Sequence, residues 1–160
     1  ATIIERYRGI AIAVNKWDLI TDKTRKTHKE FEEKIRMDAP FLAFVPIVFT
    51  SAKTGMRIQK TMEILHRIAE RMNGRIQTAK LNELVHHLQD EHPPQIYRGR
   101  RPKILYAVQG GKAPPEFVFF AKMPNAISPS YRRYISNQIR QRFDFDGVSF
   151  KLVFRRRKSS

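Results

Sequence analysis

The chain has 160 residues, and its hydrophobic fraction of 41% is enough for a packed core in one ordinary domain or in two small ones. It contains no cysteine, which excludes disulfides and thiolate metal sites, and no apolar run that approaches the length of a membrane helix. Thirty-one Lys and Arg against 15 Asp and Glu give a net charge of +16, which favours a polyanionic partner such as nucleic acid over charge that only keeps the protein soluble.

The first part of the chain predicts strands that alternate with helices. A continuous apolar run over residues 10–14 predicts a strand buried on both faces, and residues 46–50 predict a second strand. Between them, residues 24–37 are rich in Lys and Glu and carry Phe31 and Ile35 four positions apart, as an amphipathic helix does. Apolar residues at helical spacing predict a second helix: Ile58, Met62, Leu65, Ile68 and Ala69. This alternation indicates a right-handed β–α–β unit with parallel strands.

The charge of the chain changes where the second helix is expected to end. Residues 1–73 contain 14 Lys and Arg and nine Asp and Glu, whereas residues 74–160 contain 17 and six, so the net charges are +5 and +11. Asn73 and Gly74 are residue types that commonly end a helix. We therefore predict two domains, 1–73 and 74–160.

The second domain is expected to have an α+β fold. Its first helix carries an apolar stripe made of Leu81, Leu84, Val85 and Leu88. Three strands are expected, over residues 103–109, 116–122 and 148–154, and the first two are joined by a hairpin-like connection over 110–115. Ser128 fits the N-cap of a second helix that begins at Pro129. The buried side of that helix is predicted to be Tyr131, Tyr134, Ile135, Gln138 and Ile139.

Polar residues follow the first predicted strand as Asn15-Lys16-Trp17-Asp18. This position is the carboxyl end of a parallel strand, where open α/β sheets bind ligands. A carboxylate at Asp18 can accept hydrogen bonds from the ring imino N–H and the exocyclic amine of guanine, and adenine offers no such pair. Asn15 can bond a base acceptor or tie neighbouring loops together, and the aliphatic stem of Lys16 can lie along the flat ring.

A second polar segment, Ser51-Ala52-Lys53, follows the second predicted strand directly. A small residue here lets a backbone N–H approach the guanine carbonyl oxygen, and Thr54-Gly55 then turns the chain into the next helix. Either segment alone is explained equally well as a polar loop. Because both follow buried strands, in order and with one helix between them, we favour a guanine site. Its predicted residues are Asn15, Lys16, Asp18, Ser51, Ala52 and Lys53.

The first motif resembles the Asn-Lys-x-Asp guanine-specificity motif of Ras-like GTPases, and the second resembles their Ser-Ala-Lys motif. The Asn-Lys-Trp-Asp form, joined to a basic α+β domain, is similar to the Der (EngA) family of bacterial GTPases, which have two tandem G domains and a C-terminal KH-like domain. The resemblance implies that residues 1–73 are the end of the second G domain and residues 74–160 the KH-like domain. It also implies GTP or GDP as ligand, a cytoplasmic location without membrane contact, and a role in maturing the large ribosomal subunit. The implied partners are that subunit or its precursor, ribosomal RNA and the parent protein's own G domains.

The groups that hold nucleotide phosphates are missing from the sequence. No Gly-x-x-x-x-Gly-Lys-Ser/Thr occurs, and the only Asp-x-x-Gly, at residues 144–147, follows the guanine motifs and is interpreted as a turn before the last strand. We expect Mg²⁺ to be held by residues absent from this chain, and no catalytic or metal-binding residue is predicted within it. The intact parent is expected to be a GTPase, and this chain alone to recognise guanine without hydrolysing GTP.

Basic residues of the second domain are candidates for contact with RNA. A KH module clamps nucleotides with a Gly-x-x-Gly loop, and the sequence contains none. Arg133 and Arg140 lie opposite the apolar side of the last predicted helix and are expected to face solvent, with Arg132 able to reach it. The RNA-binding candidates are Arg132, Arg133 and Arg140, together with a terminal tail of Arg155, Arg156, Arg157 and Lys158; Arg98, Arg100, Arg101 and Lys103 are further basic residues. A second hypothesis is that this domain docks on the parent's G domains and senses their nucleotide state.

Aromatic residues are mostly interpreted as structural. Trp17 is expected to pack in the core or against a loop, and for Tyr97 and Tyr106 core packing is favoured over stacking on bases. No set of histidines has the spacing of metal ligands, so no metal site is predicted.

Overall fold

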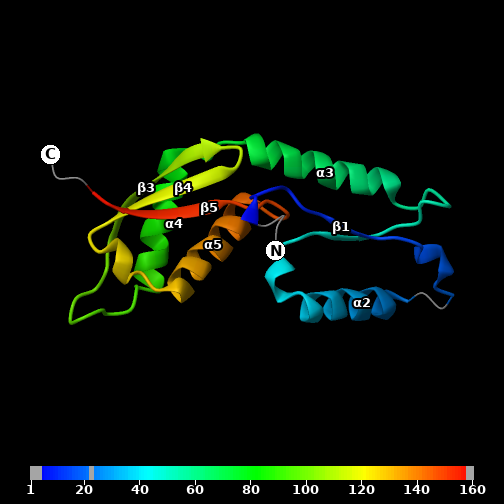
Figure 1. Ribbon diagram of the computed structural model, residues 1–160, viewed down its shortest axis with the longest axis horizontal. Helices are drawn as coiled ribbons and strands as arrows, with labels where there is room; N and C mark the ends of the chain where they lie inside the picture. Colours follow the sequence, from blue (N-terminus) through cyan, green and yellow to red (C-terminus); the bar gives the residue numbers. More distant parts are fainter. Residues whose placement is uncertain (1–4, 22–23, 158–160) are drawn as a thin grey trace.

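The computed structural model, which describes residues 5–21 and 24–157, is a mixed α/β fold with two separate sheets (Figure 1). The first sheet and its helices comprise β1 (Ile12–Val14), α2 (Arg25–Asp38), β2 (Ile47–Phe49) and α3 (Ile58–Asn73), with short 3₁₀ turns at Trp17–Leu19 and Pro40–Leu42. The second group comprises α4 (Thr78–Glu91), β3 (Ile104–Lys112), β4 (Pro115–Ala121), a 3₁₀ turn at Pro124–Ala126, α5 (Pro129–Phe143) and β5 (Lys151–Arg156). The predicted fold class, a parallel sheet with helices followed by a small α+β unit, is confirmed.

The first sheet consists of β1 and β2 paired in parallel, with Ala13 opposite Val48, and α2 and α3 lie on opposite sides of the pair (Figure 1). The Thr24 hydroxyl caps α2 by accepting the backbone N–H of Thr27 at 3.2 Å. The prediction that the first strand is buried on both faces is wrong, because Ala13 is exposed. On α3, Met62 is also 61% exposed. This half therefore presents apolar surface that the described residues leave uncovered.

The second sheet has the strand order β3-β4-β5. β3 and β4 are antiparallel, with Val108 opposite Val118, whereas β5 lies parallel to β4. A parallel neighbour needs a crossover connection, and α5 provides it. As predicted, α5 begins at Pro129, and the Ser128 hydroxyl caps it by accepting the N–H of Tyr131 at 3.2 Å.

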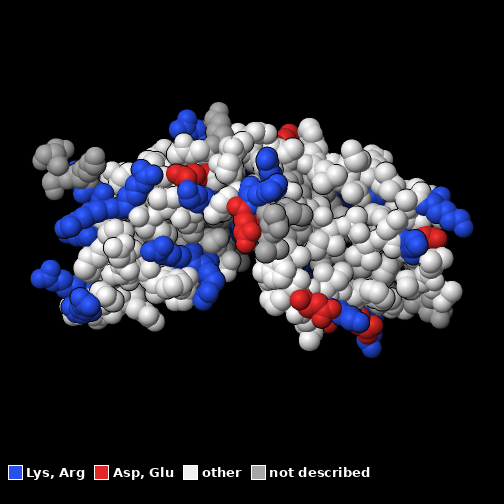
Figure 2. All heavy atoms as spheres, in the orientation of Figure 1, with Lys and Arg blue, Asp and Glu red and all other residues white. Residues whose placement is uncertain are grey.

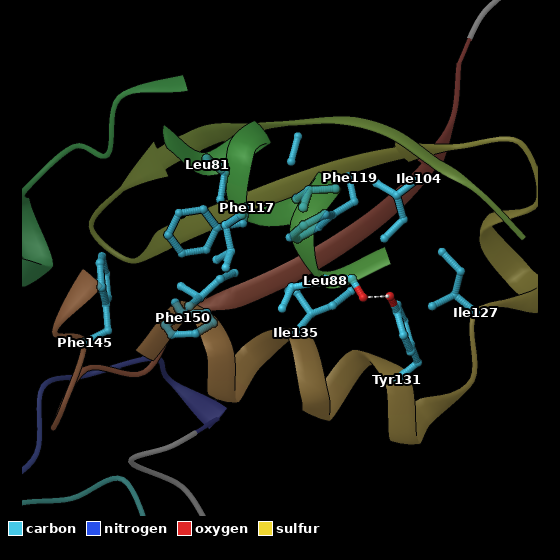
Figure 3. Packing of buried hydrophobic residues seen from close by; sticks show 14 of the residues in the cluster. Leu81, Leu88, Ile104, Phe117, Phe119, Ile127, Tyr131, Ile135, Phe145 and Phe150 are labelled. Atoms are coloured by element: carbon cyan, nitrogen blue, oxygen red, sulfur yellow. Dashed lines mark hydrogen bonds between the residues drawn. The ribbon is translucent and has the colours of Figure 1, made fainter. Parts of the chain in front are cut away.

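Helices α4 and α5 pack against the same face of this sheet and enclose the core (Figure 3). Among the side chains most deeply buried are Leu81, Leu88, Phe117, Phe119, Ile135 and Ile139. Between the two helices, the Tyr131 hydroxyl donates a long hydrogen bond of 3.5 Å to the carbonyl of Leu88. Burial, with a smaller contribution from Tyr134, raises the pKa of Tyr131 to about 12, so the hydroxyl keeps its proton at neutral pH. The apolar stripe predicted for α4 is confirmed; of the side predicted for α5, Tyr131, Ile135 and Ile139 are buried, whereas Tyr134 and Gln138 are only partly so.

Amide side chains of α4 cover the free edge of β3. Asn82 accepts the backbone N–H of Ala107 and donates to its carbonyl, both at 2.8 Å. Gln89, two helical turns further along the same face, forms the same pair of bonds with Ile104, at 2.8 and 3.0 Å. A helix thus satisfies backbone groups that would otherwise need another strand, which protects the edge from pairing with a second chain.

The turn between α5 and β5 joins the two halves of the molecule. The carbonyl of Gly147 accepts the N–H of Ile10, and the N–H of Gly147 donates to the carbonyl of Phe44, both at 2.7 Å. An ion pair of 3.2 Å between Arg71 and Asp144 adds a contact beside them. Because Ile10 and Phe44 lie just before β1 and β2, one turn fixes the amino ends of both strands. The predicted turn at residues 144–147 is confirmed, and it has this additional structural task.

Two predicted boundaries in the second sheet were wrong. Most of the expected connection 110–115 is strand, because β3 continues to Lys112 and β4 already begins at Pro115. Residues 148–150 are buried outside any strand, and β5 runs from Lys151 to Arg156. The N–H of Val148 bonds the turn at 3.1 Å and so cannot join the sheet. The first two arginines of the expected basic tail consequently belong to a strand.

Candidate functional site

Two polar loops lie side by side at the carboxyl ends of β1 and β2. Asn15-Lys16-Trp17-Asp18 follows β1 directly, and Ser51-Ala52-Lys53 follows β2 with only Thr50 between them. The backbone pairing of the strands continues into these loops, since the N–H of Trp17 donates to the carbonyl of Thr50 at 2.9 Å. The fold thus brings the six residues predicted for guanine binding to one edge of the sheet. Their role in binding a base stays a prediction.

A side-chain hydrogen bond ties the two loops together. Asn15 Oδ1 accepts the backbone N–H of Ala52 at 3.0 Å, which is one of the two tasks that the sequence suggested for this amide. Ser51 is completely buried, and its hydroxyl accepts the N–H of Thr54 at 3.2 Å, which shapes the second loop. Ala52 and Lys53 remain exposed beyond it. The arrangement presents small and polar groups around an open surface at the strand ends.

The first loop is held in an uncommon conformation by a buried aromatic residue. Lys16 has φ 61° and ψ 30°, the left-handed region that residues other than glycine seldom adopt. Trp17 is only 2% exposed and packs against the rings of Phe31 and Phe49, so its predicted packing role is confirmed. The exposed Lys16 and the half-buried Asp18 flank this anchor. Strain of this kind persists where the surroundings dictate the geometry, and it often marks functional loops.

Arg140 does not face solvent, and that prediction was wrong. Its Nη1 donates to the carbonyl of Phe145 at 3.1 Å and to the carbonyl of Val148 at 2.5 Å. Its guanidinium carbon lies 3.8 Å from the centroid of the Phe44 ring and 4.4 Å from that of Phe150. Burial lowers the pKa of Arg140 to about 10, which still leaves the group charged at neutral pH. The turn after α5 covers this side of the helix, so Arg140 joins the two halves of the chain, and its contact with RNA stays a prediction that this position does not favour.

Arg132 is also engaged within the chain, whereas Arg133 is exposed as predicted. Arg132 Nε donates to the carbonyl of Ile127 at 3.1 Å, and Nη2 donates to that of Pro124 at 3.2 Å. Its guanidinium also lies over the ring of Phe154, 4.7 Å from the centroid. Arg132 therefore reaches solvent only in part, and α5 offers a smaller basic surface than the sequence suggested.

Basic residues gather instead at the end of the second sheet. Arg155, Arg156 and Arg157 are exposed there, and Lys158 lies outside the described residues. A cavity of about 690 Å³ at this end has five basic lining residues: Arg100, Arg101, Lys122, Arg156 and Arg157. Figure 2 shows Lys and Arg clustered over this end of the molecule. The register of β4 against β5 brings Lys122 close to Arg156, because Arg156 pairs with Ala121, the neighbour of Lys122.

The positions of Lys122 and Tyr97 were not expected from the sequence. Lys122 was not among the candidates, because only the register of β4 against β5 brings it to the basic cavity. Tyr97 is 48% exposed, so the favoured core packing was wrong for this residue. Tyr106 is partly buried and stacks on Phe120 with ring centroids 4.5 Å apart, but neither ring belongs to the core, so core packing was wrong for Tyr106 too.

Residues 5–21 and 24–157 offer neither a metal centre nor a helix that could span a membrane. They contain no group of three or more His, Cys, Asp or Glu side chains that could hold a metal ion. Over the same ranges, none of the helices combines the length and apolarity needed to cross a membrane.

Comparison with known proteins gives both a family-model match and a set of similar chains. A family model described as the KH-domain-like, C-terminal domain of EngA bacterial GTPase enzymes matches residues 75–155. The GTPase Der of Desulfitobacterium hafniense is 42% identical over 153 residues, which covers 96% of this chain and 34% of that protein. The GTPase Der of Pelotomaculum thermopropionicum is 43% identical over 153 residues, with the same coverage. That of Geotalea uraniireducens is 42% identical over 155 residues, 97% of this chain and 35% of that protein.

The chain spans about a third of the length of these relatives. The family model covers the second sheet and its helices, while the similarity to the relatives extends over nearly the whole chain, both polar loops included. The chain therefore belongs to the Der (EngA) family of bacterial GTPases, whose C-terminal portion it represents.

Proposed function

We propose that this chain supplies guanine recognition to a GTP-hydrolysing protein. The observation that carries the proposal is the 3.0 Å hydrogen bond from the Ala52 N–H to Asn15 Oδ1, which joins two motif loops at the ends of parallel strands. Bound guanine would donate its imino N–H and its amine to the carboxylate of Asp18, and the stem of Lys16 would cover one face of the ring. The name GTPase Der, borne by the relatives, supports GTP and GDP as the nucleotides.

Phosphate binding and hydrolysis are assigned to the rest of a longer parent protein. The sequence has no phosphate loop, and the chain spans about a third of its relatives. Apolar side chains on α3 support this division, since Ile58, Met62 and Leu65 are 41%, 61% and 43% exposed and a complete G domain would cover them. Residues of that missing part would also hold Mg²⁺, and the chain by itself would not hydrolyse GTP.

In the full-length protein, Asp18→Asn is expected to weaken GTP binding about 10- to 100-fold and to favour XTP. The carboxylate only accepts hydrogen bonds, whereas an amide places a donor opposite a guanine donor and suits the extra carbonyl of xanthine. Competition binding with GTP and XTP measures the change. Asp38→Asn is the matched control, because Asp38 is exposed at the end of α2. A variant at Asp18 with unchanged preference for GTP would show that another group reads the base.

We further propose that the basic second half contacts ribosomal RNA while the parent acts, in the cytoplasm, on the maturing large ribosomal subunit. Residues 74–160 carry a net charge of +11, and five cationic side chains line one cavity at the end of the second sheet. Phosphates neutralise such a group and release counterions, which supports binding that depends on salt. Because the sequence contains no Gly-x-x-Gly loop, this end replaces the usual KH clamp as the proposed phosphate surface.

The double variant Arg156→Gln with Arg157→Gln is expected to weaken binding to many RNA sequences about equally. It should also flatten the dependence of log affinity on log salt by about 0.7 to 0.9 for each lost phosphate contact. Fluorescence anisotropy with RNA at several salt concentrations measures both effects. The control, Lys26→Gln with Lys29→Gln, removes the same charge from two exposed positions of α2. Equal effects of the two double variants would mean that net charge, rather than this surface, governs binding.

A second candidate function is docking within the parent protein. The bonds from Gly147 to Ile10 and Phe44 favour it, because they already join the second half to the strands that carry the motif loops. In this alternative the basic surface meets another G domain of the parent and senses its nucleotide state. A chain that binds no RNA even at low salt would make docking the leading function.

A further inference from the structure

A short hairpin lies beside the basic cavity. Tyr97 and Arg100 exchange both backbone hydrogen bonds, at 2.8 and 3.1 Å, around the two-residue turn of Arg98 and Gly99. These two residues have φ 48° and 73°, as a type I′ turn requires. Prolines lie near both ends of the loop, since Pro94 and Pro102 are both buried. The hairpin is thus held in place without being part of the sheet.

The hairpin exposes apolar side chains in the most basic part of the chain. Ile96 is 63% and Tyr97 48% exposed, and the other large exposed hydrophobic residues among those described all lie before residue 74. The core does not use the Tyr97 ring, and the guanidinium of Arg98 lies 5.4 Å from its centroid. An exposed aromatic ring beside arginines is the combination that binds unpaired bases, because every base has a flat face that can stack.

Arg100 connects the hairpin to the basic cavity. It pairs with Tyr97 through the backbone, and its side chain lines the cavity together with Arg101, Lys122 and Arg156. Neither Asp nor Glu lines this cavity of about 690 Å³, so its charges repel one another until an anion enters. A stacking surface and a phosphate site are therefore adjacent. The base and the phosphate of one nucleotide lie next to each other in the same way.

Resting on the proposed contact with ribosomal RNA, we propose that this end of the molecule binds unpaired nucleotides. A base stacks on the ring of Tyr97, and the neighbouring phosphates enter the cavity between Arg100, Arg101 and Arg156. Duplex RNA offers phosphates but keeps its bases stacked inside the helix, so it uses the cavity without the ring. The hairpin thus adds a preference for single-stranded segments to a surface whose affinity comes from charge.

The test uses the 160-residue chain and two labelled RNAs, a single strand of about 12 nucleotides and a stable RNA duplex of similar charge. Tyr97→Leu removes the aromatic ring and keeps apolar bulk, and it is expected to weaken single-strand binding about 5- to 100-fold. Tyr97→Phe keeps the ring and is expected to stay within about twofold of the parent. Duplex affinity and the salt dependence should change little in either variant. Thermal unfolding checks that both variants keep the fold.

Three outcomes would overturn the inference, and they separate it from the RNA proposal. If Tyr97→Leu binds the single strand as tightly as the parent chain while Arg156→Gln with Arg157→Gln binds weakly, stacking is wrong and the phosphate surface stands. Equal losses for the single strand and the duplex would mean that Tyr97 supports the loop rather than a base. If the unaltered chain binds neither RNA at low salt, the RNA proposal itself fails, and the exposed hairpin becomes a protein-docking feature.

Discussion

Gly147→Ala is expected to lower the free energy of unfolding by about 2–5 kcal/mol. Gly147 has φ +74°, which costs any residue with a Cβ atom about 1–2 kcal/mol. The added Cβ would also lie 2.6 Å from the carbonyl oxygen of Ile10, 2.6 Å from Ile68 Cδ1 and 2.9 Å from Pro46 Cδ. One of these atoms is backbone, so the clash can be relieved only by moving the chain before β1 away from the turn. Denaturant unfolding of the 160-residue chain measures the loss.

Gly99 provides a matched control for this substitution. Its φ is +73°, nearly the same as that of Gly147, but no atom lies within 4 Å of the position that a Cβ would take. Gly99→Ala should therefore show the conformational cost alone, about 1–2 kcal/mol. The difference between the two variants isolates the close approach of the two halves at Gly147. If both variants lose the same stability, the close contact at Gly147 does not exist in solution. Strands β1 and β2, which carry the motif loops, are then not anchored on this turn.

Local features of the fold could be predicted from the sequence because they depend on neighbours in the chain. The stripe of Leu81, Leu84, Val85 and Leu88 is buried as its spacing predicted, and Ser128 caps α5. The meeting of the two motif loops was also predictable, since parallel strands end at the same edge of a sheet. The bond between Asn15 and Ala52 was one of two possibilities, and only the structure selects it.

Features that depend on distant segments could not be predicted in this way. Helical spacing places Arg140 opposite the apolar stripe, but it does not show that residues 144–148 fold back over that side. Lys122 and Arg156 are more than thirty positions apart, and only the parallel pairing of β4 with β5 brings them to one cavity. Tyr97 is of a residue type that commonly packs in cores, and its exposure follows from a hairpin that leaves the sheet. The observed basic surface therefore differs more from its predicted set of residues than the guanine site does.

Arg140→Ala is expected to cost about 2–4 kcal/mol of unfolding free energy, far more than a surface arginine does. The substitution removes the guanidinium donor from the carbonyls of Phe145 and Val148 and leaves space between the rings of Phe44 and Phe150. The lowered pKa of Arg140 shows that burial opposes its charge, so the loss should be smaller than the sum of its contacts. Arg140→Met fills part of the space without the hydrogen bonds and should give an intermediate loss.

Arg133→Ala is the matched control, because it removes the same charge from the same helix at an exposed position. We expect a change in stability within about 0.5 kcal/mol. RNA affinity, measured well below the unfolding temperature of each variant, separates the effect of charge from that of structure. Arg140→Ala should bind RNA as tightly as the parent chain, because the Arg140 guanidinium of the parent already contacts carbonyls and rings. If Arg140→Ala is as stable as Arg133→Ala and weakens RNA binding more, the side chain reaches solvent after all. The interface between the two halves would then rest on the Gly147 bonds, the Arg71–Asp144 ion pair and the packing of Ile68 into the core of the second half.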